Sequence, residues 1–211
     1  ASLSVSYDFE SSPISPNIMP LFKKAIYEDS VYPKNNLKEL SRPVIAFHSY
    51  KGGVGRTLSL IAFAQAWTSI QDDPQKNKLL IIDSDLEAPG LTLIQGNSIE
   101  EIVSTAEALM GTLTLPIETS QQRVEHFFLP TYRYEQQLFD LYASPQTITI
   151  SRNKEYILAE VLSSLAAQLG ASAVLVDLRA GISEYSAPLL LDPRVKKYCV
   201  TSTSLQSIMG T

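Results

Sequence analysis

Residues 45–60 read IAFHSYKGGVGRTLSL, and this stretch decides how the chain folds. A short apolar run leads into a glycine-rich turn, and the turn leads into residues that suit a helix. Gly52, Gly53 and Gly55 let the backbone curl so that successive N–H groups point inward, and the N-terminal end of the following helix adds positive charge. The stretch therefore predicts a loop that binds phosphate. A turn of this kind can also serve packing alone, so other motifs have to decide between the two.

The spacing is close to that of the phosphate-binding loop G-x-x-x-x-G-K-[ST], with two departures. Tyr50 stands at the first glycine, and Arg56 stands at the lysine. Thr57 occupies the position whose hydroxyl binds Mg²⁺. Lys51, directly before Gly52, brings a second cation to the phosphates.

The segment KGGVGRT, residues 51–57, resembles the deviant loop of the ParA/MinD superfamily of ATPases, usually KGGVGKT, and is most similar to the subgroup with KGGVGR. The resemblance implies that Lys51 reaches the partner's phosphates in a dimer that encloses nucleotide. It also implies that Arg56 takes the catalytic place of the loop lysine. Consecutive residues would bind the nucleotide: Gly52, Gly53, Val54, Gly55, Arg56, Thr57 and Leu58.

A second segment, residues 79–91, reads LLIIDSDLEAPGL and ends in two carboxylates and a Pro-Gly turn. Its continuous aliphatic run is typical of a parallel strand buried on both faces. Asp83 and Asp85 are two residues apart, so on an extended segment they point the same way. The resemblance implies that Asp85 orients the attacking water and that Asp83 supports the Mg²⁺ shell. A solvated strand end is the alternative interpretation.

A third segment, residues 172–184, reads SAVLVDLRAGISE and repeats the order of strand and aspartate. It resembles a Walker B strand followed by a switch region. Asp177 would hold Mg²⁺ through water, because Mg²⁺ keeps much of its hydration and needs only one or two carboxylates. Gly181 would let the backbone approach the γ-phosphate. Arg179 is either a phosphate sensor or a solvated arginine.

Composition bounds the class of protein. The 211 residues are 45% hydrophobic and 18% charged, which suffices for one sizeable core. The net charge of −5 gives no overall attraction to nucleic acid. The single cysteine, Cys199, excludes an intrachain disulfide or a cysteine-ligated cluster from one chain, and we expect it to be an inert core residue. Neither a membrane-spanning apolar run nor a signal-peptide pattern is present, so the cytoplasm is expected.

The chain divides into an extension or linker, residues 1–43, and a nucleotide-binding domain, residues 44–211. The extension is expected to pack on the core and to carry a short helix at 21–29. Alternating strands and helices predict an α/β fold: a three-layer, doubly wound, mostly parallel sheet with helices on both faces. The resemblance makes it a P-loop NTPase, truncated before the family's C-terminal segment. Helices are expected at 56–70, 98–111 and 156–169, and further strands at 125–130 and 197–203.

Two functions fit these motifs. In the first, the protein is a Mg²⁺-dependent switch that binds and hydrolyses ATP, releases ADP, and forms a homodimer on ATP that controls binding of a protein partner. In the second, it is a nucleotide-sensing scaffold with little hydrolysis, because the planar guanidinium of Arg56 does not replace a compact ammonium cleanly. Lys51, Thr57, Asp85 and Asp177 favour the first. The family includes partition, positioning, regulatory and bacterial defence-associated ATPases, and no residue here chooses among them.

The remaining candidates point to no further site. Nothing in the sequence supports nucleic acid or membrane as a partner. The two histidines, His48 and His126, are not spaced as metal ligands, and His48 is expected to pack at a strand end beside the loop.

Overall fold

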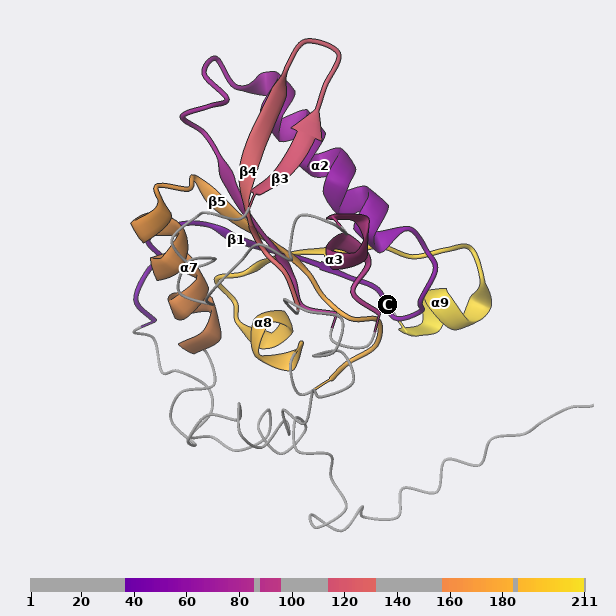
Figure 1. The fold of residues 1–211 in the computed structure, drawn as a ribbon. Helices are drawn as coiled ribbons and strands as arrows, with labels where there is room; N and C mark the ends of the chain where they lie inside the picture. Colours follow the sequence, from indigo (N-terminus) through magenta and orange to yellow (C-terminus); the bar gives the residue numbers. More distant parts are fainter. Residues whose placement is uncertain (1–36, 86–87, 96–113, 132–156, 184–185, 211) are drawn as a thin grey trace, which may run out of the picture.

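A mixed α/β sheet of six strands forms the centre of the computed structural model (Figure 1). The structure describes residues 37–85, 88–95, 114–131, 157–183 and 186–210. The strands are β1 (Val44–His48), β2 (Leu79–Asp83), β3 (Thr114–Glu118), β4 (Arg123–Leu129), β5 (Ala173–Asp177) and β6 (Lys196–Cys199). The helices in these ranges are α2 (Arg56–Ile70), α3 (Gly90–Gln95), α7 (Ile157–Leu169), α8 (Ala187–Leu191) and α9 (Leu205–Gly210).

The strand order is β3-β4-β2-β5-β1-β6, and only the β3–β4 pair is antiparallel. The chain moves in one direction across the sheet from β1 to β2, and in the other direction from β4 to β5 and β6. Crossovers between parallel strands are almost always right-handed, so opposite directions place the connecting helices on opposite faces. This confirms a mostly parallel α/β sheet.

The helices cover both faces of the sheet, which makes three layers. On β1, Ile45 and Phe47 belong to the hydrophobic cluster that contains Leu60 of α2. The alternate residues Val44 and Ala46 belong to the cluster that contains α7 and α8. Side chains along a strand point to alternate faces, so one continuous apolar strand supplies both clusters.

Helix α2 has the predicted bounds. It begins directly after Gly55, whose φ of 89° lies in the left-handed region, and it ends at Ile70. Leu60 and Ala64, one helical turn apart, are buried against the sheet. Trp67 packs on the same cluster, as predicted, and its indole N–H donates to the Asn77 carbonyl at 2.9 Å.

The end of the N-terminal extension packs on α7, which confirms the predicted contact for the part that is described. Leu40 lies against the α7 cluster. The Arg42 N–H donates to Ser163 Oγ at 2.7 Å, and the Ser163 hydroxyl donates back to the Arg42 carbonyl at 2.9 Å. The helix predicted at 156–169 is α7 from Ile157 on. The helices predicted at 21–29 and 98–111 lie outside the described residues.

The sequence pattern predicts β4 but not its antiparallel partner β3. Pro116 lies within β3, and proline is tolerated there because β3 is an edge strand. Leu115 and Ile117 are buried on one face. The connecting turn is closed by the Thr119 N–H, which donates to the Gln122 carbonyl at 2.8 Å. A five-residue strand with an internal proline carries too weak a pattern to be recognised from sequence.

The expectation that Cys199 is a core residue is wrong. Cys199 is exposed, and so are all four residues of β6. The reason is that β6 is the other edge strand, so its apolar residues do not lie between two helical layers. The strand also ends at Cys199, four residues before the predicted end. Tyr198 nevertheless stacks on Phe47, with 5.3 Å between ring centroids.

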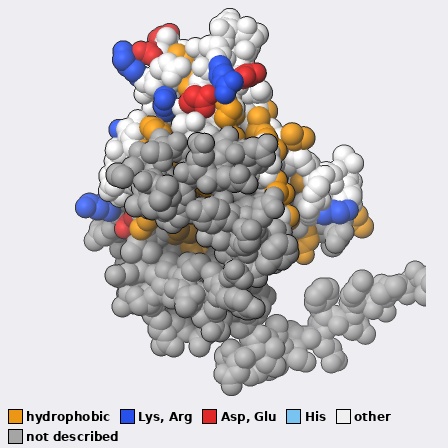
Figure 2. All heavy atoms as spheres, viewed as in Figure 1, with side chains coloured by type: hydrophobic (Ala, Val, Ile, Leu, Met, Phe, Trp, Pro, Cys, Tyr) orange, Lys and Arg blue, Asp and Glu red, His pale blue; other side chains and the backbone are white. Residues whose placement is uncertain are grey.

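Figure 2 shows charged side chains of both signs at the upper end of the molecule, and ion pairs of the β3–β4 hairpin account for part of this group. Arg123 lies 3.4 Å from Glu118 and 3.0 Å from Glu125. Such exposed pairs contribute little to stability.

Among the described helices, none is long and apolar enough to cross a membrane.

A buried histidine joins α2 to two strands. His126 Nδ1 accepts the Leu79 N–H at 3.1 Å, and Nε2 lies 2.9 Å from Thr68 Oγ1. The Thr68 hydroxyl donates to the Ala64 carbonyl at 2.8 Å, so it accepts from Nε2, and the imidazole is neutral with its proton on Nε2. Burial lowers the pKa of His126 from 6.5 to about 4.

We expect this histidine to make stability pH-dependent. The unfolded chain binds the proton first as pH falls below 6.5, so the free energy of unfolding decreases until about pH 4, a span worth roughly 3 kcal/mol. His126→Asn should be less stable at pH 7.5, because hydrogen bonds are lost, and should lose less on going to pH 5. Urea unfolding at both pH values measures this. Equal losses in the two proteins would contradict the assignment.

Candidate functional site

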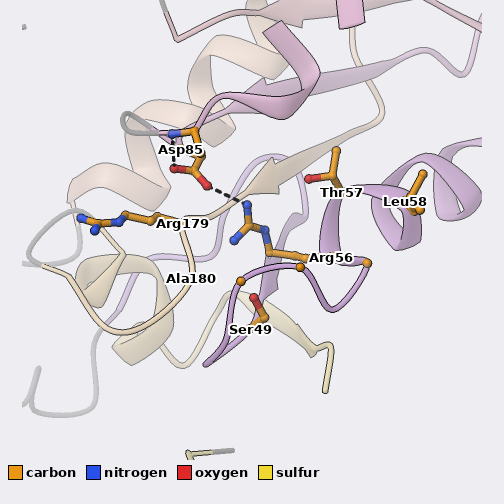
Figure 3. Close-up of a pocket in the computed structure, with 11 residues that line it drawn as sticks. Ser49, Arg56, Thr57, Leu58, Asp85, Arg179 and Ala180 are labelled. Atoms are coloured by element: carbon orange, nitrogen blue, oxygen red, sulfur yellow. Dashed lines mark hydrogen bonds and ion pairs between the residues drawn. The ribbon is translucent and has the colours of Figure 1, made fainter. Parts of the chain in front are cut away.

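A pocket of about 470 Å³ lies where β1, β2 and β5 end at their carboxyl edges (Figure 3). Ligands of open α/β sheets bind at this edge. Three segments line it: the turn after β1 with the start of α2, the segment after β2, and the segment after β5. The lining residues are Ser49, Gly52, Gly53, Gly55, Arg56, Thr57, Leu58, Asp85, Ala88, Arg179 and Ala180.

The glycine-rich turn has the conformation that its sequence predicts. Gly53 and Gly55 have φ values of 74° and 89°, which disfavour any residue with a side chain. A Cβ placed on Gly52 would meet no atom within 4 Å among the described residues, so the turn leaves room on that side. Lys51 is exposed and does not line the pocket, and Val54 is half-buried. Backbone N–H groups at the N-terminus of α2 therefore border a cavity.

Thr57 and Asp177 meet at this edge, although 120 residues separate them. The Thr57 hydroxyl donates to Asp177 Oδ2 at 2.6 Å. A hydroxyl and a carboxylate side by side are hard oxygen donors of the kind that Mg²⁺ binds. Gly90 of α3 lies beside the threonine, and a Cβ there would lie 3.5 Å from Thr57 Oγ1, an ordinary van der Waals contact.

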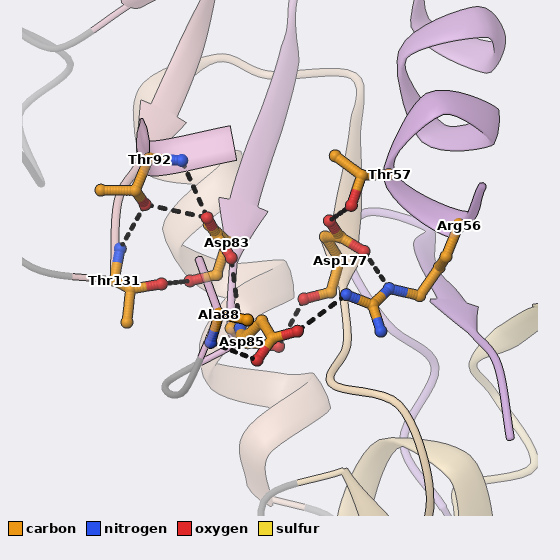
Figure 4. Close-up of polar contacts among 9 residues, drawn as sticks. Arg56, Thr57, Asp83, Asp85, Ala88, Thr92, Thr131 and Asp177 are labelled. Atoms are coloured by element: carbon orange, nitrogen blue, oxygen red, sulfur yellow. Dashed lines mark hydrogen bonds and ion pairs between the residues drawn. The ribbon is translucent and has the colours of Figure 1, made fainter. Parts of the chain in front are cut away.

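Arg56 bridges two carboxylates (Figure 4). Its Nε donates to Asp177 Oδ1 at 2.5 Å, and one terminal nitrogen donates to Asp85 Oδ2 at 2.9 Å. The three side chains are between 0% and 10% exposed. The sequence analysis places each of these residues in one site, but it does not anticipate that Arg56 is bonded to both acids.

The two aspartates of residues 79–91 do not point the same way, so that prediction is wrong. Asp83 accepts the Thr92 N–H at 2.8 Å and the Thr92 hydroxyl at 2.9 Å, whereas Asp85 faces Arg56. The strand ends at Asp83, and the Ser84 N–H turns to the Asp177 carbonyl at 3.0 Å, which breaks the alternation of side chains. Asp85 lines the pocket, while Asp83 is used to hold the first turn of α3.

Burial is the largest influence on the pKa values of two of the aspartates, Asp177 and Asp83. It raises the pKa of Asp177, although the charge of Arg56 and the hydrogen bond from Thr57 act in the opposite direction. It also raises the pKa of Asp83, against the hydrogen bonds from Thr92. Burial and the charge of Arg56 lower the pKa of His48, which is buried at the end of β1 as predicted.

The segment after β5 is fastened to the end of β1. The Gly181 N–H donates to the Ser49 carbonyl at 2.8 Å, and Gly181 has a φ of 76°. Arg179 and Ala180 border the pocket in between. The sequence motifs predict Gly181 and Arg179 as site residues, but they do not indicate Ser49, Ala88 or Ala180. The available signal for Ser49 is its place directly after the buried strand β1.

No protein-family model matches this chain, and a search of curated proteins found no match either. The functional interpretation therefore depends on the residues of the pocket and on their contacts.

We expect Arg56→Met to destabilise the protein by about 3 kcal/mol or more at pH 7.5, because it leaves two buried carboxylates uncompensated. The loss should be smaller at pH 5, since Arg56 holds down the pKa of Asp177 and the variant carboxyl protonates more readily. Urea unfolding at both pH values tests this. Arg123→Met, which removes an exposed ion-paired arginine, is the control and should change little. An equally small effect of both substitutions would show that Arg56 is not needed for folding.

Proposed function

We propose that this protein is a Mg²⁺-dependent P-loop ATPase and a molecular switch of the ParA/MinD type. One observation carries the proposal: the Thr57 hydroxyl and the Asp177 carboxylate lie 2.6 Å apart at the start of the helix that follows a glycine-rich turn. Three distant segments meet there, and each supplies the residue type that phosphate and Mg²⁺ require.

The donor set fits Mg²⁺. Thr57 and Asp177 would hold it, because each offers a hard oxygen atom. When bound, Mg²⁺ neutralises charge on the transferring phosphate. The turn supplies backbone N–H groups, and α2 supplies its positive end, for the phosphate oxygens. The preference for adenine rests on the resemblance of KGGVGRT to the family.

Two residues of the chain, Asp85 and Lys51, would have separate roles in catalysis. Asp85 is 5% exposed and lies on the pocket wall, where a carboxylate can orient a water molecule for in-line attack. Lys51 is exposed on the turn, outside the pocket lining, which suits a cation that acts on the nucleotide of a second copy. The proposal therefore includes a homodimer that forms on ATP and controls binding of a protein partner in the cytoplasm.

The bridge formed by Arg56 supports a second candidate function, a nucleotide-sensing scaffold with little hydrolysis. Asp177 and Asp85 each give one carboxylate oxygen to the same guanidinium, so Arg56 competes with Mg²⁺ for Asp177 and with water for Asp85. A lysine would offer a compact ammonium in place of this planar fork and would hold the two acids less firmly. In this candidate, nucleotide binds but Arg56 keeps the acids out of the reaction.

Turnover of Mg-ATP separates the two candidates. We expect steady hydrolysis by the wild-type protein, and we expect Lys51→Ala and Asp85→Ala each to lower kcat about 100-fold or more. Lys76→Ala removes a lysine that is 84% exposed and paired with Asp73, so it serves as a control that keeps activity. ATP retained after rapid desalting, without turnover, would favour the scaffold. If the protein neither hydrolyses ATP nor retains it after desalting, that result would contradict a nucleotide site.

Arg56→Lys gives an independent test. If the protein is a working ATPase, the arginine already supports catalysis, and we expect the lysine variant to keep kcat within about tenfold. If the protein is a scaffold, the wild type is inactive and the lysine variant gains turnover. Phosphate release measured on both proteins distinguishes these results.

A further inference from the structure

Ser49 carries a buried hydroxyl whose environment differs from that of the other site residues. The residue is 1% exposed, and its Oγ has no hydrogen-bond partner among the described residues. Within those residues, two other buried side-chain atoms share this property, Arg42 Nε and His48 Nδ1. Of the three residues, Ser49 is the one that lines the pocket.

A buried hydroxyl without a partner is unfavourable. The hydroxyl loses its hydrogen bonds to water and gains none within the protein, whereas most buried polar groups in proteins do have partners. Such a group calls for a partner outside the protein chain, such as water, an ion or a ligand. The position of Ser49 on a pocket wall supplies the place for that partner.

The backbone fixes where this hydroxyl lies. Ser49 directly follows β1, and its carbonyl accepts the Gly181 N–H at 2.8 Å, which ties the residue to the segment after β5. Figure 3 shows Ser49 on the side of the pocket formed by the glycine-rich turn, below Arg56 in the view. Ser49 therefore borders the same cavity as the positive end of α2, where an anion is favoured.

We propose that the Ser49 hydroxyl donates a hydrogen bond to a phosphate oxygen of the bound nucleotide. This inference rests on the proposed function and adds a binding residue that the motif G-x-x-x-x-G-K-[ST] does not contain. Ser49 is a binding residue in this account, and the O–H keeps its proton throughout.

Ser163 provides a matched control. It is also 1% exposed, but its hydroxyl accepts the Arg42 N–H and donates to the Arg42 carbonyl, and it does not line the pocket. Removal of the two hydroxyls should therefore have opposite consequences. Ser163→Ala should lower the thermal unfolding midpoint and leave nucleotide binding unchanged. Ser49→Ala should leave the midpoint unchanged or raise it, because no hydrogen bond is lost.

The experiment is calorimetric titration of Mg-ADP and Mg-ATPγS into the wild-type protein and both variants, with unfolding midpoints measured in parallel. We expect Ser49→Ala to weaken binding about tenfold or more, the effect of one hydrogen bond to a charged oxygen. Ser49→Cys, with a thiol of similar shape that donates poorly, should weaken binding in the same way and exclude an effect of shape alone.

The two nucleotides locate the contact. Weaker binding of Mg-ATPγS alone would assign the hydroxyl to the terminal phosphate, and weaker binding of both would assign it to an inner one. Unchanged affinity for both nucleotides, or a lower unfolding midpoint with unchanged affinity, would overturn the inference while leaving the nucleotide site intact. If the wild type binds neither nucleotide, the proposed function fails, and the role of Ser49 fails with it.

Discussion

A carboxylate buried at the end of β5 organises the pocket. Asp177 is 0% exposed, and its side chain accepts hydrogen bonds from Arg56 and Thr57. Its backbone carbonyl accepts both the N–H and the hydroxyl of Ser84, at 3.0 Å and 2.8 Å. A buried charge is costly unless it is paired, so the carboxylate fixes the start of α2, while the backbone carbonyl fixes the exit of β2. The pocket forms between the segments that Asp177 connects.

The same constraint explains why the arginine in the glycine-rich turn matters. Burial raises the pKa of Asp177, and the positive charge of Arg56 opposes that shift. Arg56 also holds Asp85, so one guanidinium compensates two acids on neighbouring strand ends. A ligand that uses either acid would share that carboxylate with Arg56. Under the proposed function, the arginine would therefore link folding stability to ligand binding, which a residue that only contacted phosphate would not do.

Much of this arrangement is predictable from sequence, because buried parallel strands are continuous aliphatic runs and glycine-rich turns are distinctive. The predicted bounds of α2 hold, and the contact between Thr57 and Asp177 is of the kind that their motif positions predict. What the sequence does not reveal is which side chains form hydrogen bonds with one another in the site. Asp83 and Asp85 diverge because the chain turns at Ser84, and the bridge by Arg56 depends on how two strand ends lie in space. The edge strands β3 and β6 are not continuous buried aliphatic runs, because each has a neighbouring strand on one side only.

The central claim is that Thr57 and Asp177 form the metal end of a nucleotide site. It is tested most directly by the Mg²⁺ dependence of ATP affinity in the wild type, Thr57→Val and Thr57→Ser, measured by equilibrium binding with Mg²⁺ or with chelator. The account predicts that Mg²⁺ tightens binding in the wild type and in Thr57→Ser, which keeps the hydroxyl, but not in Thr57→Val, which keeps the shape alone. The same Mg²⁺ effect in all three proteins, or none in the wild type, would contradict it.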